Sequence, residues 1–392
     1  MSARRNSRTI NLQSAPHGTH HANRIGLASL IISPALSNRI MSTIEDQRAK
    51  AGFKYSEDIA PGLEVHMDLR KIHIRTLSEF QKIDVIETYF GKMLITDGKT
   101  QSAQSDEFAY HESLVHPPLI QSAILAGAAD GGDVSNNKPR SVFIGGGGEL
   151  ATAREVLRHR SVERVVMVDL DGKVIEVCKE YLPEWGGDQV ANNPRLELIV
   201  GDAYAYLKDC KEQFDCIIMD ISDPIEAGPG IMLYTQEFYQ HCTTLLSPNG
   251  VFVTQAGVAE SIPPEHAVDG TNDTSCFGPI YNTLGSVFDC VVPYSSNIPS
   301  FGSDWGFCMA YNSKETVSSW TGIAPEALDS MIEERITDIE SAGKEGNVGP
   351  TDVLMFYDGI AHKRMFALTK PLRQALKKDA RIMTEANPVF MY

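Results

Sequence analysis

The sequence predicts an α/β protein in which a mostly parallel, doubly wound sheet follows a small antiparallel β-domain. Three observations lead to this fold class. Apolar strands alternate with helical segments across residues 141–312, as in open parallel sheets. Four consecutive glycines, Gly145–Gly148, separate the first of these strands from a helix, and there a bare backbone lets a ligand approach closely. Upstream, residues 63–97 alternate apolar and polar side chains with the period of two that half-buried strands require.

Residues 1–50 are predicted to form a flexible tail. The first 44 residues contain five arginines and no acidic residue, among many Ser, Asn and His residues. Such a segment carries too little apolar surface to fold by itself.

An Arg-rich, acid-free start is also typical of an organelle transit peptide, so targeting to an organelle is the alternative to a cytoplasmic location. The seven cysteines form no C-x-x-C pair, which favours reduced thiols in a reducing compartment.

Residues 51–115 are predicted to form the small β-domain, built from hairpins. Alternating segments bounded by turn residues occupy 63–70, 71–76, 80–88 and 92–97. Residues 108–116 and 120–125 then have helical spacing. We expect Pro117 and Pro118 to break the helix between them, because proline removes a backbone donor.

Residues 116–315 are predicted to form a Rossmann-like domain, and residues 316–392 a helical extension. The expected strands are 142–144, 164–169, 195–200, 214–219, 250–254, 287–292 and 306–310. Seven strands that alternate with helices suggest the sheet of AdoMet-dependent transferases. In the extension, residues 328–336 and 370–378 have helical spacing.

The glycine turn indicates a nucleoside site without a phosphate cradle. The G-x-G-x-x-G pattern of dinucleotide-binding folds fails, because Leu150 stands where its third glycine belongs. The phosphate-binding Gly-Lys-Ser/Thr pattern is also missing. Glu149 places a carboxylate where a pyrophosphate would sit, and this charge favours a cationic nucleoside ligand instead. An α/β core whose glycine turn binds nothing is the plain alternative.

Acidic residues follow four of the expected strands, at the edge of the sheet where ligands bind. They are Glu149, Asp169, Asp202, Asp220 and Asp223. Asp169 lies about twenty residues beyond the glycines, where such folds place a carboxylate that holds a ribose diol. Asp202 suits the adenine amine, with the amide of Ala203 donating to the ring. The remaining three carboxylates would hold cations near the reacting centre.

Together these stretches resemble the polyamine aminopropyltransferases of the spermidine synthase family over residues 60–312. The matching stretches are Gln81, Asp97–Gln101, Asp106–Glu107, Tyr110–Glu112, Gly146–Glu149, Val168–Asp171, Gly201–Asp202 and Asp220–Ile225. A closer likeness is to the thermospermine synthase branch. Its marks are Glu149 in place of an aspartate, Tyr110–Pro117, Ile225–Pro229, Thr254–Gly257 and Pro299–Trp305.

The resemblance implies transfer of an aminopropyl group from decarboxylated S-adenosylmethionine to spermidine, giving thermospermine or spermine and 5′-methylthioadenosine. Putrescine is the alternative acceptor. The resemblance makes Asp220 the proton acceptor. The donor-binding residues would be Gln81, Gln101, Gly146, Glu149, Asp169, Asp202 and Ala203. The acceptor-binding residues would be Tyr110, His111, Asp223, Glu226 and Phe301. No metal or other cofactor is expected, and family resemblance suggests a homodimer or homotetramer.

Two positions depart from the spermidine synthase pattern. Residues 226–228, Glu-Ala-Gly, lengthen the loop after Asp223. Glu226 is therefore predicted to face an additional ammonium of spermidine, or equally only water. Leu150 replaces a small residue of the family and is expected to narrow the donor pocket.

Composition limits the function further. The net charge of −16 disfavours binding to nucleic acid and suits a cationic substrate. No apolar run approaches the ~18 residues of a membrane span.

Three alternative functions stay open: a methyltransferase on the same fold, an NAD-dependent oxidoreductase and a polyamine-binding relative without activity. Glu149 would repel the carboxylate of the methyl donor, and the failed glycine pattern disfavours NAD. Asp220, Asp223, Tyr110 and Glu149 together argue against a loss of activity.

Overall fold

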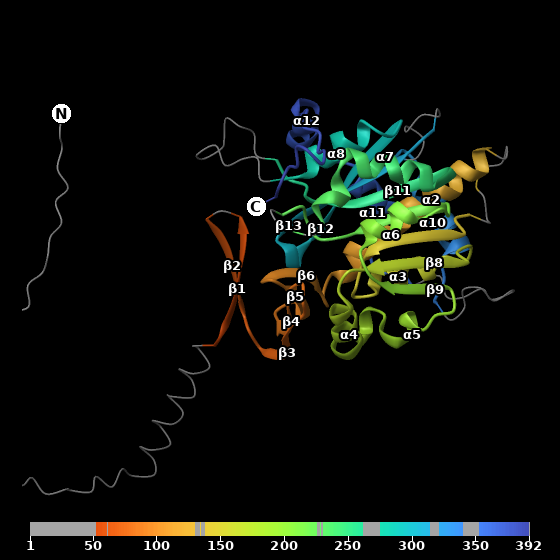
Figure 1. Ribbon diagram of the computed structural model, residues 1–392. Helices are drawn as coiled ribbons and strands as arrows, with labels where there is room; N and C mark the ends of the chain where they lie inside the picture. Colours follow the sequence, from red (N-terminus) through yellow and green to blue (C-terminus); the bar gives the residue numbers. More distant parts are fainter. Residues whose placement is uncertain are drawn as a thin grey trace, which may run out of the picture. The chain divides into compact units, whose positions relative to one another are not determined.

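A computed structural model describes residues 52–391 apart from 61, 130–133, 135–137, 226–227, 229, 262–274, 314–320 and 340–352. Phe53–Tyr392 form one compact unit, whose ribbon is shown in Figure 1. The expected tail, residues 1–50, lies outside the described residues. None of the described helices is long and apolar enough to cross a membrane.

Two small antiparallel sheets precede the main one (Figure 1), as the alternating pattern predicted. β1 (Lys54–Ala60) pairs with β2 (Leu63–Asp68). The second sheet has the order β3-β4-β5-β6, with strands Lys71–Leu77, Lys82–Thr88, Gly91–Thr96 and Lys99–Ala103. Its two inner strands are buried on both faces. Ile83 and Val85 pack in one cluster with Trp185, while Ile86 and Met93 pack in another with Met67 of β2.

The main sheet has seven strands in the order β12-β13-β11-β10-β7-β8-β9, which confirms the predicted fold class. The strands are β7 (Ser141–Gly146), β8 (Arg164–Asp169), β9 (Leu196–Val200), β10 (Phe214–Asp220), β11 (Leu246–Val258), β12 (Cys290–Ile298) and β13 (Ser303–Tyr311). The five strands from β7 to β11 are parallel, and β13 runs antiparallel to both β11 and β12.

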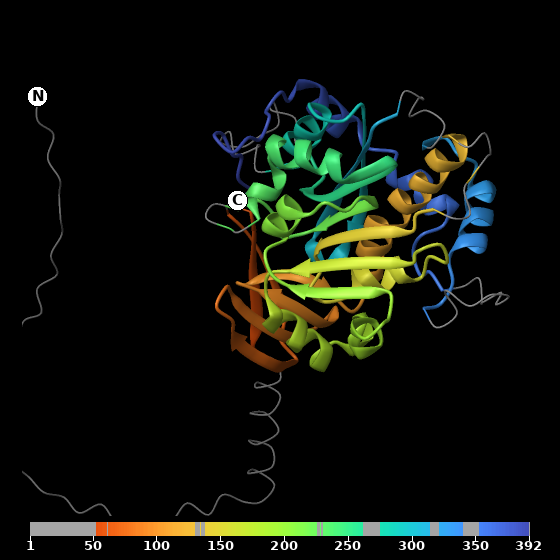
Figure 2. The same cartoon turned by 45° about the vertical axis from the view of Figure 1, so that its right-hand side comes forward.

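Helices cover both faces of this sheet, as Figures 1 and 2 show. Alternate strand residues therefore enter different clusters: Val142 and Ile144 of β7 join one core, and Phe143 between them joins the other. The α-helices are α2 (Glu107–Ala129), α3 (Ala151–Leu157), α4 (Gly172–Tyr181), α5 (Gly187–Ala191), α6 (Ala203–Asp209), α7 (Gln236–Leu245), α8 (Phe277–Gly285), α10 (Pro325–Arg335), α11 (Gly359–Met365) and α12 (Lys370–Lys378). Short 3₁₀ helices are η1 (Pro183–Trp185), η2 (Ile231–Tyr234) and η4 (Pro299–Phe301).

Helix α2 corrects one prediction. The expected break at Pro117 and Pro118 is wrong, because α2 continues through both residues to Ala129. Each proline disfavours a helix interior by roughly 3 kcal/mol. Both prolines are buried, as are most residues of α2, and the helix packs against β10, β11, β12 and α3. Tertiary burial stabilises a helix more than local propensity does, so here packing outweighs the loss of backbone hydrogen bonds.

The strand order places the site. After β7 the chain builds the sheet outward through β8 and β9, and then returns to place β10 on the other side of β7. At such a switch point the connections leave in opposite directions, which opens a crevice beyond the carboxyl ends of the two strands. The glycine turn follows β7, and Asp220 ends β10. The sheet therefore brings these two features together.

Candidate active site

The glycine turn lies directly against the end of β10. Gly146 has φ +83°, and a Cβ on it would come within 2.1 Å of the Asp220 carbonyl oxygen. The Gly147 amide donates to that same oxygen over 3.0 Å. Only glycine tolerates both the left-handed backbone and this close approach. The turn thus holds the Asp220 backbone, and the following residues carry Glu149 to the same place.

Two hydroxyls orient the Asp220 carboxylate. The Tyr110 hydroxyl, from α2, donates to Oδ1 over 2.8 Å, and the Thr152 hydroxyl, from the first turn of α3, donates to Oδ2. Burial and the neighbouring Glu149 carboxylate raise the pKa of Asp220 to about 6. A carboxylate with this pKa is mostly ionised near pH 7 and is a stronger base than an ordinary aspartate.

His111 stands beside Asp220, between two glutamates. Its side chain is fully buried, with Nδ1 2.9 Å from Glu107 Oε2 and Nε2 3.2 Å from Glu149 Oε1. Burial opposes protonation, but the hydrogen bonds to both glutamates raise the pKa of His111 to about 10. His111 is therefore a buried imidazolium near neutral pH, and it fixes the side chain of Glu149.

His111, Glu149 and Asp220 each offer a ligand atom, and these atoms lie within 4.8 Å of one another. This spacing would admit a metal ion. An imidazole binds a metal only when the coordinating nitrogen carries no proton, and the raised pKa keeps both nitrogens of His111 protonated. Metal binding at this cluster would therefore have to displace a proton from His111.

Two further predicted carboxylates, Asp169 and Asp202, lie at the ends of β8 and β9. Asp169 accepts the Asp171 amide on Oδ1 over 2.8 Å, and burial raises its pKa to about 6. Asp202 caps α6, where its Oδ1 accepts the amides of Tyr204 and Ala205. The cap places the Ala203 amide in the first turn of that helix, where amides lack helical partners.

The two predicted glutamines differ in placement. Gln81, just before β4, donates to Asp171 Oδ2 over 3.0 Å and so joins the small β-sheet to the segment that follows β8. Gln101, on β6, donates to the Lys99 carbonyl in its own strand over 3.3 Å. Among the described residues it makes no hydrogen bond to the site carboxylates, and its role in donor binding stays a prediction.

A second acidic centre lies beyond β10. Asp223 Oδ1 accepts the side-chain amide of Gln255 over 3.0 Å, and burial raises the pKa of Asp223 to about 6. Gln255 also donates to the Tyr234 hydroxyl over 2.7 Å and accepts from the Trp305 indole over 3.1 Å. The predicted acceptor residue Glu226 lies outside the described residues.

The aromatic ring of Phe301 contacts side chains from both acidic groups of the site, the one around Asp220 and the one around Asp223. The Phe301 ring lies 5.9 Å from the Tyr110 ring and 4.8 Å from Trp305, centroid to centroid. The buried carboxylate of Asp106 holds the turn that carries Phe301, because it accepts both the amide and the hydroxyl of Ser300, over 2.7 and 2.8 Å. Phe301 thus lies against both Tyr110, which bonds to Asp220, and Trp305, which bonds to Gln255.

Three polar residues were not among the predicted site residues. Gln255 lies in β11, near its carboxyl end, so the position rule that selected the aspartates could have found it. Glu107 lies in the stretch Asp106–Glu107 that resembles the family, so the resemblance could have found it. Thr152 carries no comparable signal, because a threonine in the first turn of a helix is ordinary. The partners of Glu107 and Thr152 become visible only when α2 and α3 pack together.

Leu150 was expected to narrow the donor pocket, and its side chain lies in the hydrophobic core. It is fully buried in the hydrophobic core cluster that contains Ile144 and Val156. A Cβ on Gly186 would come within 2.9 Å of the Leu150 Cβ. The side chain thus packs beneath the turn between α3 and the η1–α5 segment. Its backbone is left-handed, with φ 76°, the conformation that a third glycine would adopt without strain.

Comparisons with known proteins agree on one family. The family model described as spermine/spermidine synthase domain matches residues 107–319. The chain is 37% identical to a polyamine aminopropyltransferase of Sulfolobus acidocaldarius, over 82% of this chain and 92% of that protein. It is 35% identical to thermospermine synthase ACAULIS5 of Arabidopsis thaliana, over 86% of this chain and 87% of that protein.

Two solved structures have the same fold. One is a spermidine synthase in complex with the transition state analogue AdoDATO, with a TM-score of 0.63 and 27% identity over 83% of this chain and 95% of that one. The other is the spermidine synthase from Thermotoga maritima, with a TM-score of 0.61 and 26% identity over 83% of this chain and 94% of that one.

Proposed function

The chain belongs to the spermine/spermidine synthase family, and we propose that it transfers the aminopropyl group of decarboxylated S-adenosylmethionine to spermidine. The products are thermospermine or spermine and 5′-methylthioadenosine. One observation carries the proposal: the Asp220 carboxylate, oriented by Tyr110 and Thr152, has an oxygen within 4.8 Å of an oxygen of Glu149. A polyamine amine requires such a base, and a cationic donor requires such an anion.

Asp220 is the general base of this reaction. The attacking amine has a pKa near that of lysine, about 10, so its deprotonation near pH 7 costs about 4 kcal/mol. Its nitrogen forms a bond to the methylene carbon next to the sulfonium. The carbon–sulfur bond breaks, its electron pair stays on sulfur, and the proton moves from nitrogen to Asp220. Alignment of the two substrates supplies much of the remaining acceleration.

Glu149 selects the donor. The aminopropyl ammonium of the decarboxylated donor pairs with this glutamate, which His111 holds in place over 3.2 Å. Ordinary S-adenosylmethionine carries a carboxylate beside the same amine. In a buried site this carboxylate would repel the carboxylate of Glu149. No metal or covalent nucleophile is required, because a sulfonium is already a good leaving group.

The nucleoside of the donor lies along the ends of β8 and β9. Asp169 accepts from the ribose diol, and its burial strengthens these hydrogen bonds. Asp202 accepts from the adenine amine, while the Ala203 amide donates to the ring. Gln81 and Asp171 form the wall between the small β-sheet and the sugar.

Spermidine is preferred over putrescine as the acceptor. Asp223 holds a second ammonium of the acceptor while Asp220 takes the proton of the reacting one. Phe301 and Tyr110 flank the methylene carbons between them. The thermospermine synthase ACAULIS5 of Arabidopsis thaliana aligns over 86% of the chain, which supports the longer acceptor. Putrescine stays the second candidate, since two of the solved structures are spermidine synthases.

Product analysis tests the proposal. Incubation with the decarboxylated donor and spermidine should release one methylthioadenosine for each tetraamine, separated by chromatography that distinguishes spermine from thermospermine. Asp220→Asn should lower kcat at least about 100-fold and leave donor binding measurable. Formation of S-adenosylhomocysteine from S-adenosylmethionine would identify a methyltransferase instead. Full activity of Asp220→Asn would remove Asp220 from the mechanism.

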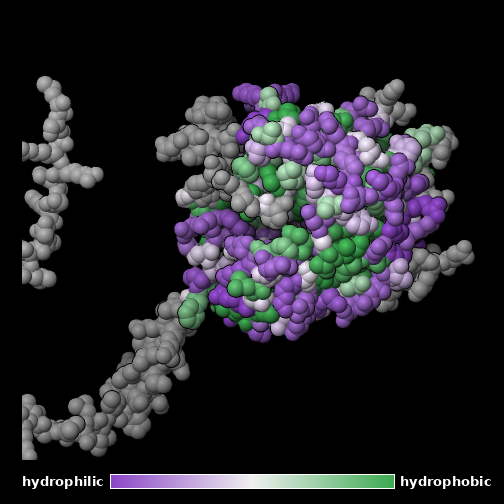
Figure 3. All heavy atoms as spheres, viewed as in Figure 1, coloured by the Kyte–Doolittle hydropathy of each residue, from purple (hydrophilic) through white to green (hydrophobic). Residues whose placement is uncertain are grey.

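The protein assembles as a homodimer or homotetramer through the N-terminal strands. Much of the exposed large apolar surface of the described residues falls within 53–89, at Phe53, Leu63, Ile72, Leu77, Phe80 and Tyr89. On the face shown in Figure 3, apolar patches interrupt a largely hydrophilic surface. An interface on these strands would remove those six side chains from water. Light scattering on the purified chain should give twice or four times its mass, and Leu77→Lys should reduce it.

A further inference from the structure

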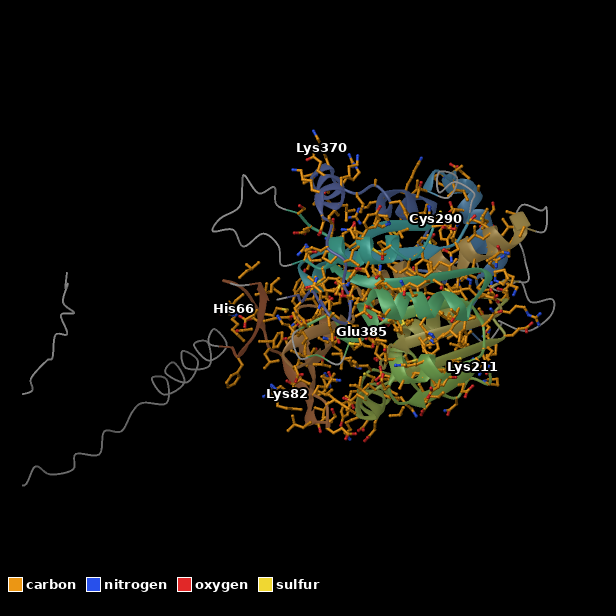
Figure 4. All side chains as sticks on the ribbon, turned by 45° about the horizontal axis from the view of Figure 1, so that its top comes forward. His66, Lys82, Lys211, Cys290, Lys370 and Glu385 are labelled. Atoms are coloured by element: carbon orange, nitrogen blue, oxygen red, sulfur yellow. The ribbon has the colours of Figure 1, made fainter. Side chains whose placement is uncertain are left out.

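A segment far along the sequence, residues 379–391, reaches the acceptor side of the site. The amide of Met383 donates to the Thr283 hydroxyl of α8 over 2.9 Å, and its carbonyl accepts the Gln236 amide of α7 over 2.8 Å. Glu385, labelled in Figure 4, accepts the Tyr204 hydroxyl over 3.2 Å. These bonds tie the segment to three helices on one face of the sheet.

The segment then pairs with the loop that carries Asp223. The Met391 amide donates to the Pro224 carbonyl over 2.8 Å, and Met391 forms a parallel bridge with Ile225. The residue that bonds to Met391 thus immediately follows Asp223 in the chain. Residues 389 and 391 also pack on the hydrophobic cluster between α7 and α8.

The Met391 side chain and the Asp223 carboxylate both border Gly257. Gly257 has φ +70°, and a Cβ on it would lie 3.1 Å from Met391 Sδ and 3.3 Å from Asp223 Oδ1. The sulfur and the carboxylate oxygen therefore flank the same point. Any residue larger than glycine at 257 would contact both groups.

We propose that Met391 is a specificity-determining residue for the acceptor, whose thioether packs on the methylene carbons next to the ammonium held by Asp223. The inference rests on the proposed function and assigns it one more residue. A polyamine alternates ammonium groups with apolar methylene runs, so its site needs an anion and an apolar wall side by side. Methionine is flexible and uncharged. It covers the methylene carbons and leaves the Asp223 charge for the ammonium.

Two substitutions separate the side chain from the backbone contact. Met391→Ala keeps the amide that bonds to Pro224 and removes only the apolar wall. Met391→Lys places an ammonium beside Asp223, where it competes with the ammonium of the acceptor. Met331, a half-buried methionine of α10 packed on the other core cluster, supplies the matched controls Met331→Ala and Met331→Lys.

Steady-state kinetics with each substrate varied in turn tests the proposal. Met391→Ala should raise the KM for spermidine about fivefold, and Met391→Lys at least about tenfold, while the KM for the donor stays within twofold. The Met331 variants should leave both KM values unchanged. An unchanged spermidine KM in Met391→Ala, or equal losses for donor and acceptor, would overturn the assignment. Met391→Ala alone decides if Met391→Lys does not fold. Failure of the wild-type chain to release methylthioadenosine with any polyamine would instead overturn the proposed function.

Discussion

The Tyr110 hydroxyl lies 2.8 Å from Oδ1 of Asp220, although 110 positions separate the two residues. Tyr110 belongs to the first turns of α2, and Asp220 ends β10. The bond therefore joins the helix that follows the small β-sheet to the switch point of the main sheet. It aims one carboxylate oxygen, while Thr152 aims the other. Both hydroxyls favour the ionised form of Asp220.

The activity should depend on the ionisation of Asp220. Its pKa is raised to about 6, and only the carboxylate accepts a proton. We expect kcat/KM for spermidine, expressed per neutral amine, to be constant above pH ~7 and to fall about tenfold per pH unit below ~5.5. A pH profile of initial rates, corrected for the loss of neutral acceptor amine, measures this limb. An acidic limb near pH 4 would show that another group is the base.

Tyr110→Phe should weaken the base without removing it. The substitution deletes one donor to the carboxylate, so the pKa of Asp220 should rise further and the acidic limb should move to higher pH. A kcat loss of about 10- to 100-fold is expected at pH 6.5, with partial recovery at pH 8.5. Tyr294→Phe serves as the control, because this buried tyrosine bonds to the Ser113 carbonyl instead. Identical pH profiles for wild type and Tyr110→Phe would contradict the role.

Asp223→Asn should stabilise the substrate-free protein. The folded-state pKa of Asp223 is raised to about 6, above the value near 4 of an unfolded aspartate. The native state therefore binds the proton more tightly, and ionisation above pH 6 lowers stability. We expect Asp223→Asn to increase the free energy of unfolding by about 1–3 kcal/mol at pH 7.5.

The same gain should shrink as the pH falls through 6 and vanish below pH ~4, where the aspartate is protonated in both states. Asparagine keeps the oxygen that accepts from Gln255, so that hydrogen bond survives. Urea unfolding at pH 7.5 and pH 4.5 distinguishes the two regimes. The variant should also raise the KM for the acceptor. A loss of stability at pH 7.5 would mean that the Asp223 charge is well compensated.

Two substitutions of Leu150 measure how much its left-handed backbone lowers the stability of the protein. Leu150→Ala keeps the strained backbone and removes buried side-chain contacts, so a loss of about 2–4 kcal/mol is expected. Leu150→Gly removes the same contacts but relieves roughly 1 kcal/mol of backbone strain, and should be the more stable of the two. At Val156, buried in the same cluster but inside α3, the order should reverse, because glycine disfavours a right-handed helix by about 1 kcal/mol relative to alanine. Thermal or urea unfolding of the four variants measures both orders.

Local sequence determined much of the fold. Buried parallel strands appear in a sequence as apolar runs, and a tight turn favours glycine. The seven strands and the glycine turn could therefore be predicted from local sequence, without knowledge of tertiary contacts. The carboxylates were visible for the same reason, because each follows directly on a strand. Parallel strands in one sheet end at a common edge, which makes Glu149, Asp169, Asp202 and Asp220 neighbours by topology alone.

The tertiary structure decided what depends on packing between distant segments. Pro117 and Pro118 stay helical because α2 is buried against the sheet. Leu150 lies in the core because Gly186, 36 positions away, leaves room for it. The contacts of Tyr110 with Asp220 and of Met391 with the Asp223 loop join segments more than 100 residues apart. Local patterns carry no information about such pairs, because each contact forms only when independent elements are packed on the same sheet.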